Sequence, residues 1–130
     1  MLREDSEGEG LRLTRTGEGM SYEFALGMFR HQQTIATAFI KLMSELCKNL
    51  PKLKFILRPH PSENHEFWRE ITSSLPNIEV VHEGNVIPWL LACDALIHNG
   101  CTTAVEATVL GRPVISFQPV VSQCYDYHLP

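Results

Sequence analysis

The chain has 130 residues, enough for one ordinary domain with its own core and too few for two. Hydrophobic residues make up 44% of it and charged residues 20%, a balance typical of globular proteins rather than disordered or fibrous ones. The formal charge is −4, and the eleven Lys and Arg residues are scattered along the chain. This pattern argues against DNA or RNA as a main partner.

The termini and the cysteines point to an intracellular setting. No apolar run follows Met1 that could serve as a signal peptide, and charged residues interrupt the longest apolar-rich window, residues 34–50. We therefore expect a cytoplasmic protein without a membrane span. No C-x-x-C pair occurs, so we expect reduced thiols rather than a zinc or redox site. The four cysteines are Cys47, Cys93, Cys101 and Cys124.

The first half of the chain predicts a leader, a long helix, a strand and a second helix. Residues 1–20 are rich in Gly and Glu and predict a flexible leader or loop. Residues 21–49 carry apolar side chains at three- and four-residue steps, which predicts a helix that Pro51 ends. The apolar run at residues 54–58 predicts a buried strand. Ser62 or Asn64 can then cap a helix that runs to about residue 75.

The second half continues the alternation. Strands are predicted at residues 78–81, 95–97 and 113–117, and helices at residues 86–92 and 102–110, with Gly111 as a favourable helix stop. Residues 119–130 show no period and predict an irregular tail.

This order predicts an α/β fold: a Rossmann-like parallel sheet of about four strands, with helices on both faces, over residues 21–118. The strands are apolar runs rather than alternating patterns, as expected for strands covered on both sides. Each helix of such a sheet connects two strands, yet no strand is predicted before the first helix. We therefore expect an incomplete domain, part of a larger protein.

A polar cluster follows the third predicted strand and has a mechanism for binding phosphate. Gly100 permits a tight turn, and Thr102 and Thr103 stand where free N–H groups begin the next helix. Glu106 follows three residues after Thr103, so it could reach a sugar hydroxyl. It could equally close a Thr-x-x-Glu capping box, and the spacing alone leaves these two alternatives even.

A second polar cluster, RPHPSE at residues 58–63, follows the first predicted strand. Arg58 and His60 could contact a ligand at the same sheet edge, and the prolines on either side of His60 would fix its orientation. The alternative is structural: an ion pair for Arg58 and a local hydrogen bond for His60. The remaining histidines show no metal-ligand spacing and are expected at the surface or in loops. These are His31, His65, His82 and His128.

Together the segments RPHPS (58–62), DALIHNGCTTAVEA (94–107) and GRPVISF (111–117) resemble the C-terminal nucleotide-binding half of GT-B glycosyltransferases. The resemblance is closest to bacterial surface-carbohydrate and capsule-polysaccharide biosynthesis proteins. It extends to the CDP-glycerol glycerophosphotransferases and the UDP-N-acetylglucosamine 2-epimerases, and it covers about residues 53–118. In relatives a serine commonly follows the glycine, where this chain has Cys101, a weaker hydrogen-bonding residue.

The resemblance implies a nucleotide-sugar donor as substrate and no tightly bound cofactor. It implies that Arg58 and His60 serve catalysis at the mouth of the site and that Glu106 contacts the ribose. It also implies a saccharide acceptor held by an N-terminal domain that this chain lacks, so the isolated chain is expected to be inactive. The implied diphosphate-binding residues are His98, Asn99, Gly100, Cys101, Thr102 and Thr103.

Three functions therefore stay open. The first is the donor-binding part of a glycosyltransferase-like protein in surface polysaccharide biosynthesis. The second is a UDP-sugar 2-epimerase-like domain, whose acid and base carboxylates would come largely from the other half. The third is a catalytically inactive binding or interaction module, in which both polar clusters serve only as caps and ion pairs.

Overall fold

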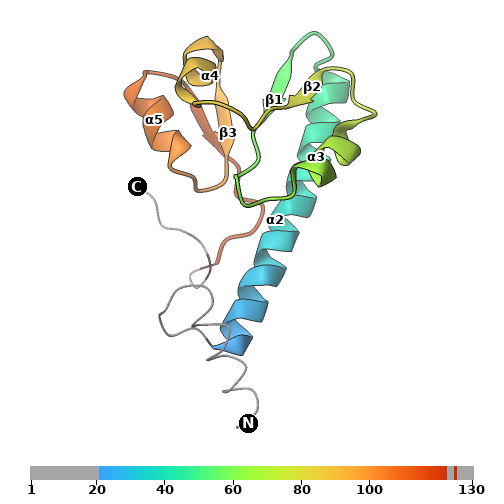
Figure 1. Ribbon diagram of the computed structural model, residues 1–130, viewed down its shortest axis with the longest axis vertical. Coiled ribbons are helices and arrows are strands. Elements are labelled where there is room, and N and C mark those ends of the chain that lie inside the picture. Colours follow the sequence, from blue (N-terminus) through green and yellow to red (C-terminus); the bar gives the residue numbers. More distant parts are fainter. Residues whose placement is uncertain (1–20, 123–124, 126–130) are drawn as a thin grey trace.

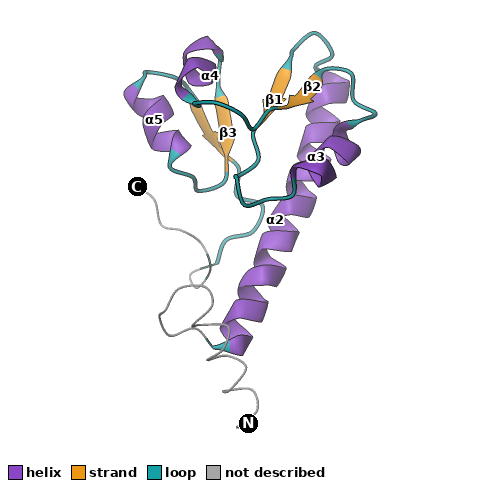
Figure 2. Ribbon diagram, in the orientation of Figure 1, coloured by secondary structure: helices purple, strands orange, loops and turns teal. Residues whose placement is uncertain are grey.

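A computed structural model describes residues 21–122 and Tyr125. Four helices and four short strands alternate in this part of the chain, so the mixed α/β prediction is confirmed (Figures 1 and 2). The predicted leader, residues 1–20, lies outside the described residues, as does most of the tail, while residues 119–122 form neither helix nor strand. The helices are α2 (Tyr22–Asn49), α3 (His65–Thr72), α4 (Ile87–Ala92) and α5 (Thr103–Val109); the strands are β1 (Phe55–Leu57), β2 (Ile78–Val80), β3 (Leu96–His98) and β4 (Val114–Ser116).

The strands form two parallel pairs rather than one continuous sheet. β1 pairs with β2 in the register Phe55 to Ile78, and β3 pairs with β4 in the register Leu96 to Val114. No ladder joins β1 to β3. The parallel direction predicted for the strands is therefore present, while the four strands are divided between two separate ladders.

Local signals fix the starts of α2 and α3 and the end of α5 near their predicted positions, while α3 ends at Thr72 rather than near residue 75. The Ser21 side chain accepts a hydrogen bond from the Phe24 N–H at 3.1 Å and starts α2, and Asn64 caps α3 in the same way through the Phe67 N–H at 3.2 Å. After α5, Gly111 has φ of +71°, the left-handed conformation that glycine adopts most readily at a helix end.

The long helix α2 contacts residues next to both strand pairs. Near its C-terminal end, the Asn77 amide donates to the carbonyl oxygens of Cys47 and Leu50 at 3.2 Å each, which ties α2 to the turn before β2. At its middle, the Phe39 ring meets the Phe117 ring edge to face at 5.0 Å, just after β4. Its N-terminal half extends beyond the strand ends (Figure 1).

His31 is a correction to the sequence prediction. It was expected at the surface or in a loop, yet it lies in α2 with a relative exposure of 8%. The Tyr125 ring lies 5.7 Å from the His31 ring and 5.1 Å from the Phe24 ring. Because this covering residue is about ninety positions away in sequence, no local pattern around His31 indicates its burial.

Candidate functional site

The turn after β3 contains most of the predicted phosphate-binding residues. Gly100 has φ of +58°, so the turn uses the conformation for which the sequence suggested a glycine. The Asn99 side-chain amide donates to the Phe117 carbonyl oxygen at 2.8 Å, which fastens the turn to the end of β4. Asn99 therefore shapes the turn, and its amide is occupied in that role.

The start of α5 carries donors without acceptors. Among the described residues, the N–H groups of Cys101, Thr102 and Thr103 have no hydrogen-bond acceptor. Thr102, the residue before the helix, makes no side-chain cap bond. The exposed Glu106 side chain has no hydrogen bond or ion pair within residues 21–122, so no capping box forms. Three N–H donors and a carboxylate thus stand unengaged within about one helical turn of each other.

His98 ends β3 beside this turn. Its Nδ1 atom is inaccessible to solvent and has no hydrogen-bond partner in the described part of the chain. Burial lowers the pKa of His98 below its usual value, because a charged imidazolium loses hydration there. The ring is therefore neutral near pH 7, with one nitrogen able to donate and the other to accept.

The turn after β1 is more occupied than the sequence suggested. The Arg58 guanidinium donates to the carbonyl oxygens of Glu83 at 3.1 Å and Gly84 at 2.9 Å, both in the loop after β2. Arg58 thus clamps the end of β1 to that loop. A guanidinium has five N–H donors, so this arrangement leaves others available to a ligand.

His60 is held within its own turn. Its Nδ1 accepts from the Ser62 N–H at 3.1 Å and lies 2.7 Å from the Ser62 hydroxyl oxygen, while its main-chain N–H donates to Glu63 Oε2 at 2.6 Å. With Nδ1 as the acceptor, the neutral ring carries its proton on Nε2. The exposed ring is thus oriented, with one donor directed away from these local bonds.

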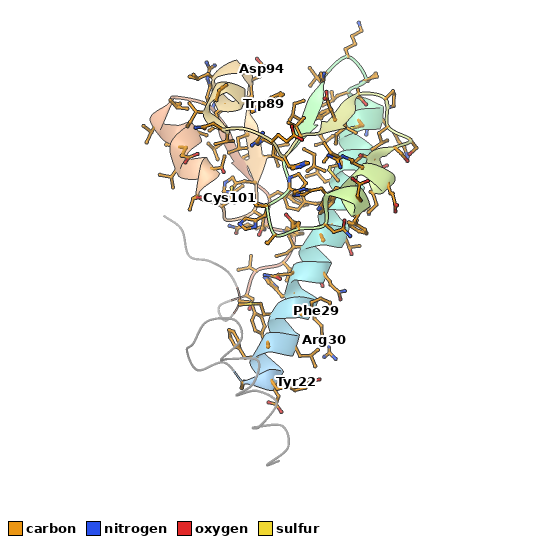
Figure 3. The ribbon with its side chains drawn as sticks, in the orientation of Figure 1. Tyr22, Phe29, Arg30, Trp89, Asp94 and Cys101 are labelled. Atoms are coloured by element: carbon orange, nitrogen blue, oxygen red, sulfur yellow. The ribbon has the colours of Figure 1, made fainter. Side chains whose placement is uncertain are left out.

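The two turns lie at the carboxyl ends of strands in different pairs. Figure 1 shows β1 and β3 running in the same direction. Both turns therefore lie on the side of the strands toward which the N-terminal half of α2 extends. Figure 3 shows Cys101 on that side and Asp94, which precedes β3, at the opposite end. No hydrogen bond or ion pair of the described residues joins Arg58 or His60 to residues 98–106. The structure thus places the clusters at one edge without linking them directly.

A third polar group beside the first turn was missed in the sequence. The His65 and His82 rings stack with centroids 4.0 Å apart, and His65 Nε2 lies 3.2 Å from the His60 carbonyl oxygen. Arg69 Nη2 lies 3.3 Å from His82 Nδ1. His65 and Arg69 are four residues apart on one helix, and this spacing could have indicated that they lie on the same face. No local pattern connects either residue to His82.

Two further properties concern the described residues alone. They contain no group of three or more His, Cys, Asp or Glu side chains placed to hold a metal ion. Within the same residues, no helix combines the length and apolar character that crossing a membrane requires.

The chain matches no protein-family model, and neither a curated protein nor a solved structure is significantly similar to it.

Proposed function

We propose that this chain is the donor-binding part of a glycosyltransferase-like protein that uses a nucleotide sugar in surface polysaccharide biosynthesis. In this proposal residues 21–118 form a Rossmann-like domain, one half of a GT-B fold. The observation that carries the proposal is the turn after β3, where three main-chain N–H groups without acceptors follow a glycine with positive φ. Such donors at the carboxyl end of a parallel strand suit a phosphate group.

Each residue of the turn then has a chemical task. The N–H groups of Cys101, Thr102 and Thr103 bind the diphosphate oxygens, and the neutral His98 ring adds a hydrogen bond. The Glu106 carboxylate is about one helical turn further on and accepts from the ribose hydroxyls, which its lack of a side-chain partner in the described residues supports. Asn99 keeps the turn in place through Phe117.

Arg58 and His60 act at the other turn on the leaving diphosphate. The donors of Arg58 that do not hold residues 83 and 84 stabilise its negative charge, and the Nε2–H of His60 donates to it. Breaking the bond between the anomeric carbon and the diphosphate oxygen leaves charge on that oxygen, and these donors stabilise this charge. The acceptor would come from a separate domain.

Nuclear magnetic resonance titration tests the binding step directly. The folded chain is titrated with UDP, CDP, GDP and CMP to millimolar concentration while the amide signals are followed. We expect at least one nucleotide to shift the amides of residues 100–103 in a saturable way. If none of the four shifts these amides in a chain whose spectrum shows it to be folded, the proposal is wrong.

Glu106→Ala separates a ribose contact from a structural role. Because Glu106 is exposed and unpaired, the substitution should change the free energy of unfolding by less than about 0.5 kcal/mol. Loss of one charged hydrogen bond to ribose should weaken nucleotide affinity about tenfold, near 1.4 kcal/mol. Glu70→Ala is the matched control, since Glu70 is also exposed on a helix but lies on α3. Reduced stability with unchanged affinity would instead assign Glu106 a structural role.

One observation favours the inactive binding module as the second candidate. Arg58 and His60 already have main-chain and side-chain partners in the described residues, as a purely structural turn would require. In that case Arg58→Met would lower stability without changing nucleotide affinity.

A further inference from the structure

The hydrogen bonds of β1 show which of its main-chain groups face away from β2. The Phe55 N–H donates to the Asn77 carbonyl oxygen at 2.8 Å, and the Leu57 carbonyl oxygen accepts from the Val81 N–H at 2.9 Å. Successive residues of a strand direct these groups to opposite sides. The N–H and C=O of Ile56 therefore point to the other edge of β1.

The same reasoning applies to β3. The Leu96 N–H donates to the Pro113 carbonyl oxygen at 2.9 Å, and the His98 carbonyl oxygen accepts from the Phe117 N–H at 2.8 Å. The N–H and C=O of Ile97 therefore point away from β4. Neither Ile56 nor Ile97 has a main-chain hydrogen bond outside its own pair in the described part of the chain, although both residues are only half exposed.

These open edges belong to strands with the composition of central strands. β1 consists of Phe55, Ile56 and Leu57, and β3 begins with Leu96 and Ile97, without the charge or proline that usually protects an exposed edge. β2, by contrast, carries Glu79 at its middle, in an exposed ion pair with Lys54 at 3.0 Å. Within the first pair, the edge that lacks protection is thus that of β1, and β3 has the same apolar character at its first two residues.

The open edges of β1 and β3, at Ile56 and Ile97, are together called the slot. Figure 1 draws β1 and β3 as the inner strands of the two pairs, and no ladder joins them. The helix α2 contacts residues next to both pairs, Asn77 before β2 and Phe117 after β4. A strand placed between β1 and β3 would hold them about 9–10 Å apart, twice the usual spacing of neighbouring strands.

We propose that the slot between β1 and β3 binds an extended, apolar peptide segment from outside these 130 residues, which hydrogen-bonds to Ile56 on one side and Ile97 on the other. The result is a continuous five-stranded sheet. The segment must be apolar on both faces, as its two neighbours are, and at least three or four residues long to match them. This inference does not depend on the nucleotide proposal.

The chain's own leader is a poorer occupant. Its most strand-like stretch, LRLTRT at residues 11–16, alternates in polarity and places an arginine on each face. A buried central strand would have to accommodate both charges, which is costly without partners. A second copy of the chain has no further strand to offer among residues 21–122, because its four strands are already paired.

Amide hydrogen exchange on the full chain tests the proposal. The probe is a synthetic peptide with five alternating valines and isoleucines between terminal lysines; the control peptide has proline at its centre, which lacks the N–H donor. We expect the first peptide to slow exchange at Ile56 and Ile97 at least tenfold and the control peptide to have no effect. The amides of Phe55 and Leu57, which face β2, should change much less.

Several outcomes would overturn the proposal. Unchanged exchange at Ile56 and Ile97, or slowing at Val80 and Val114 on the outer edges, would show that the slot does not bind the peptide. Protection that rises with chain concentration alone would assign the slot to a second copy. Protection present without peptide and lost on deleting residues 1–16 would assign it to the leader.

A variant provides a second readout. Ile56→Pro removes the N–H that faces the slot and keeps the hydrogen bonds to β2, so the chain should fold and bind the peptide at least tenfold more weakly. If this variant does not fold, the exchange measurement on the unmodified chain still decides the question.

Discussion

Arg58 offers the sharpest test of how the first turn is built. Its guanidinium donates to two carbonyl oxygens, at 3.1 and 2.9 Å, and so joins the end of β1 to the loop after β2. A hydrogen bond from a charged donor contributes about 1.5–3 kcal/mol when buried, and both of these are exposed to solvent. We therefore expect Arg58→Met to lower the free energy of unfolding by about 1–2 kcal/mol in total.

Urea unfolding followed by tryptophan fluorescence measures this change. Arg58→Lys should cost about half as much as the methionine variant, since a single nitrogen can replace only one of the two hydrogen bonds well. Lys54→Met is the matched control: its exposed ion pair with Glu79 at 3.0 Å should be worth less than about 0.5 kcal/mol. An Arg58→Met variant with the wild-type midpoint and slope would refute the clamp.

Three further predictions concern other parts of the chain. Burial lowers the pKa of His98 in the folded state, so the unfolded chain binds more protons between that lowered pKa and about 6.5, and stability rises with pH through this interval. When the pH falls from 7.5 to 5.5, the free energy of unfolding should therefore decrease less in the His98→Asn variant than in the wild type, as measured by urea midpoints. An equal decrease in both proteins would contradict this. Asn77→Ala removes an amide that donates to the carbonyl oxygens of three residues, at 3.0–3.2 Å, and should cost about 2–3 kcal/mol in thermal or urea unfolding. A Cβ at Gly27 would clash with the Tyr125 hydroxyl. Because alanine favours a helix more than glycine does, Gly27→Ala should stabilise the chain by about 1 kcal/mol, but only when Tyr125 is also replaced by alanine. Equal effects with and without the Tyr125 substitution would show that Tyr125 does not pack against Gly27.

Structural features that depend on only a few neighbouring residues could be predicted from the sequence. The three- and four-residue spacing of apolar side chains predicted α2, Asn64 was one of two caps predicted for α3, and Gly111 ends α5 in the left-handed conformation. Each of these features depends on backbone conformation within about one helical turn. The order of strands and helices followed from the same local signals.

Features that depend on distant partners were not readable. Arg58 binds main-chain carbonyl groups 25 and 26 residues away, and every residue type carries such a group. His31 is buried in a helix whose local pattern looks exposed there. Glu106 at its position fitted both a cap and a ligand contact, and only the geometry shows that no cap bond forms.

The division of the strands bears directly on the candidate site. The turn with Arg58 and His60 ends one pair, and the turn from His98 to Thr103 ends the other. A nucleotide sugar that contacts both turns needs them at a fixed separation, and hydrogen bonds do not set the distance between β1 and β3. A strand in the slot would set it, because its ladders fix the spacing on both sides. Filling the slot should therefore tighten nucleotide binding when both turns contact the ligand, and leave it unchanged when the turn after β3 binds alone.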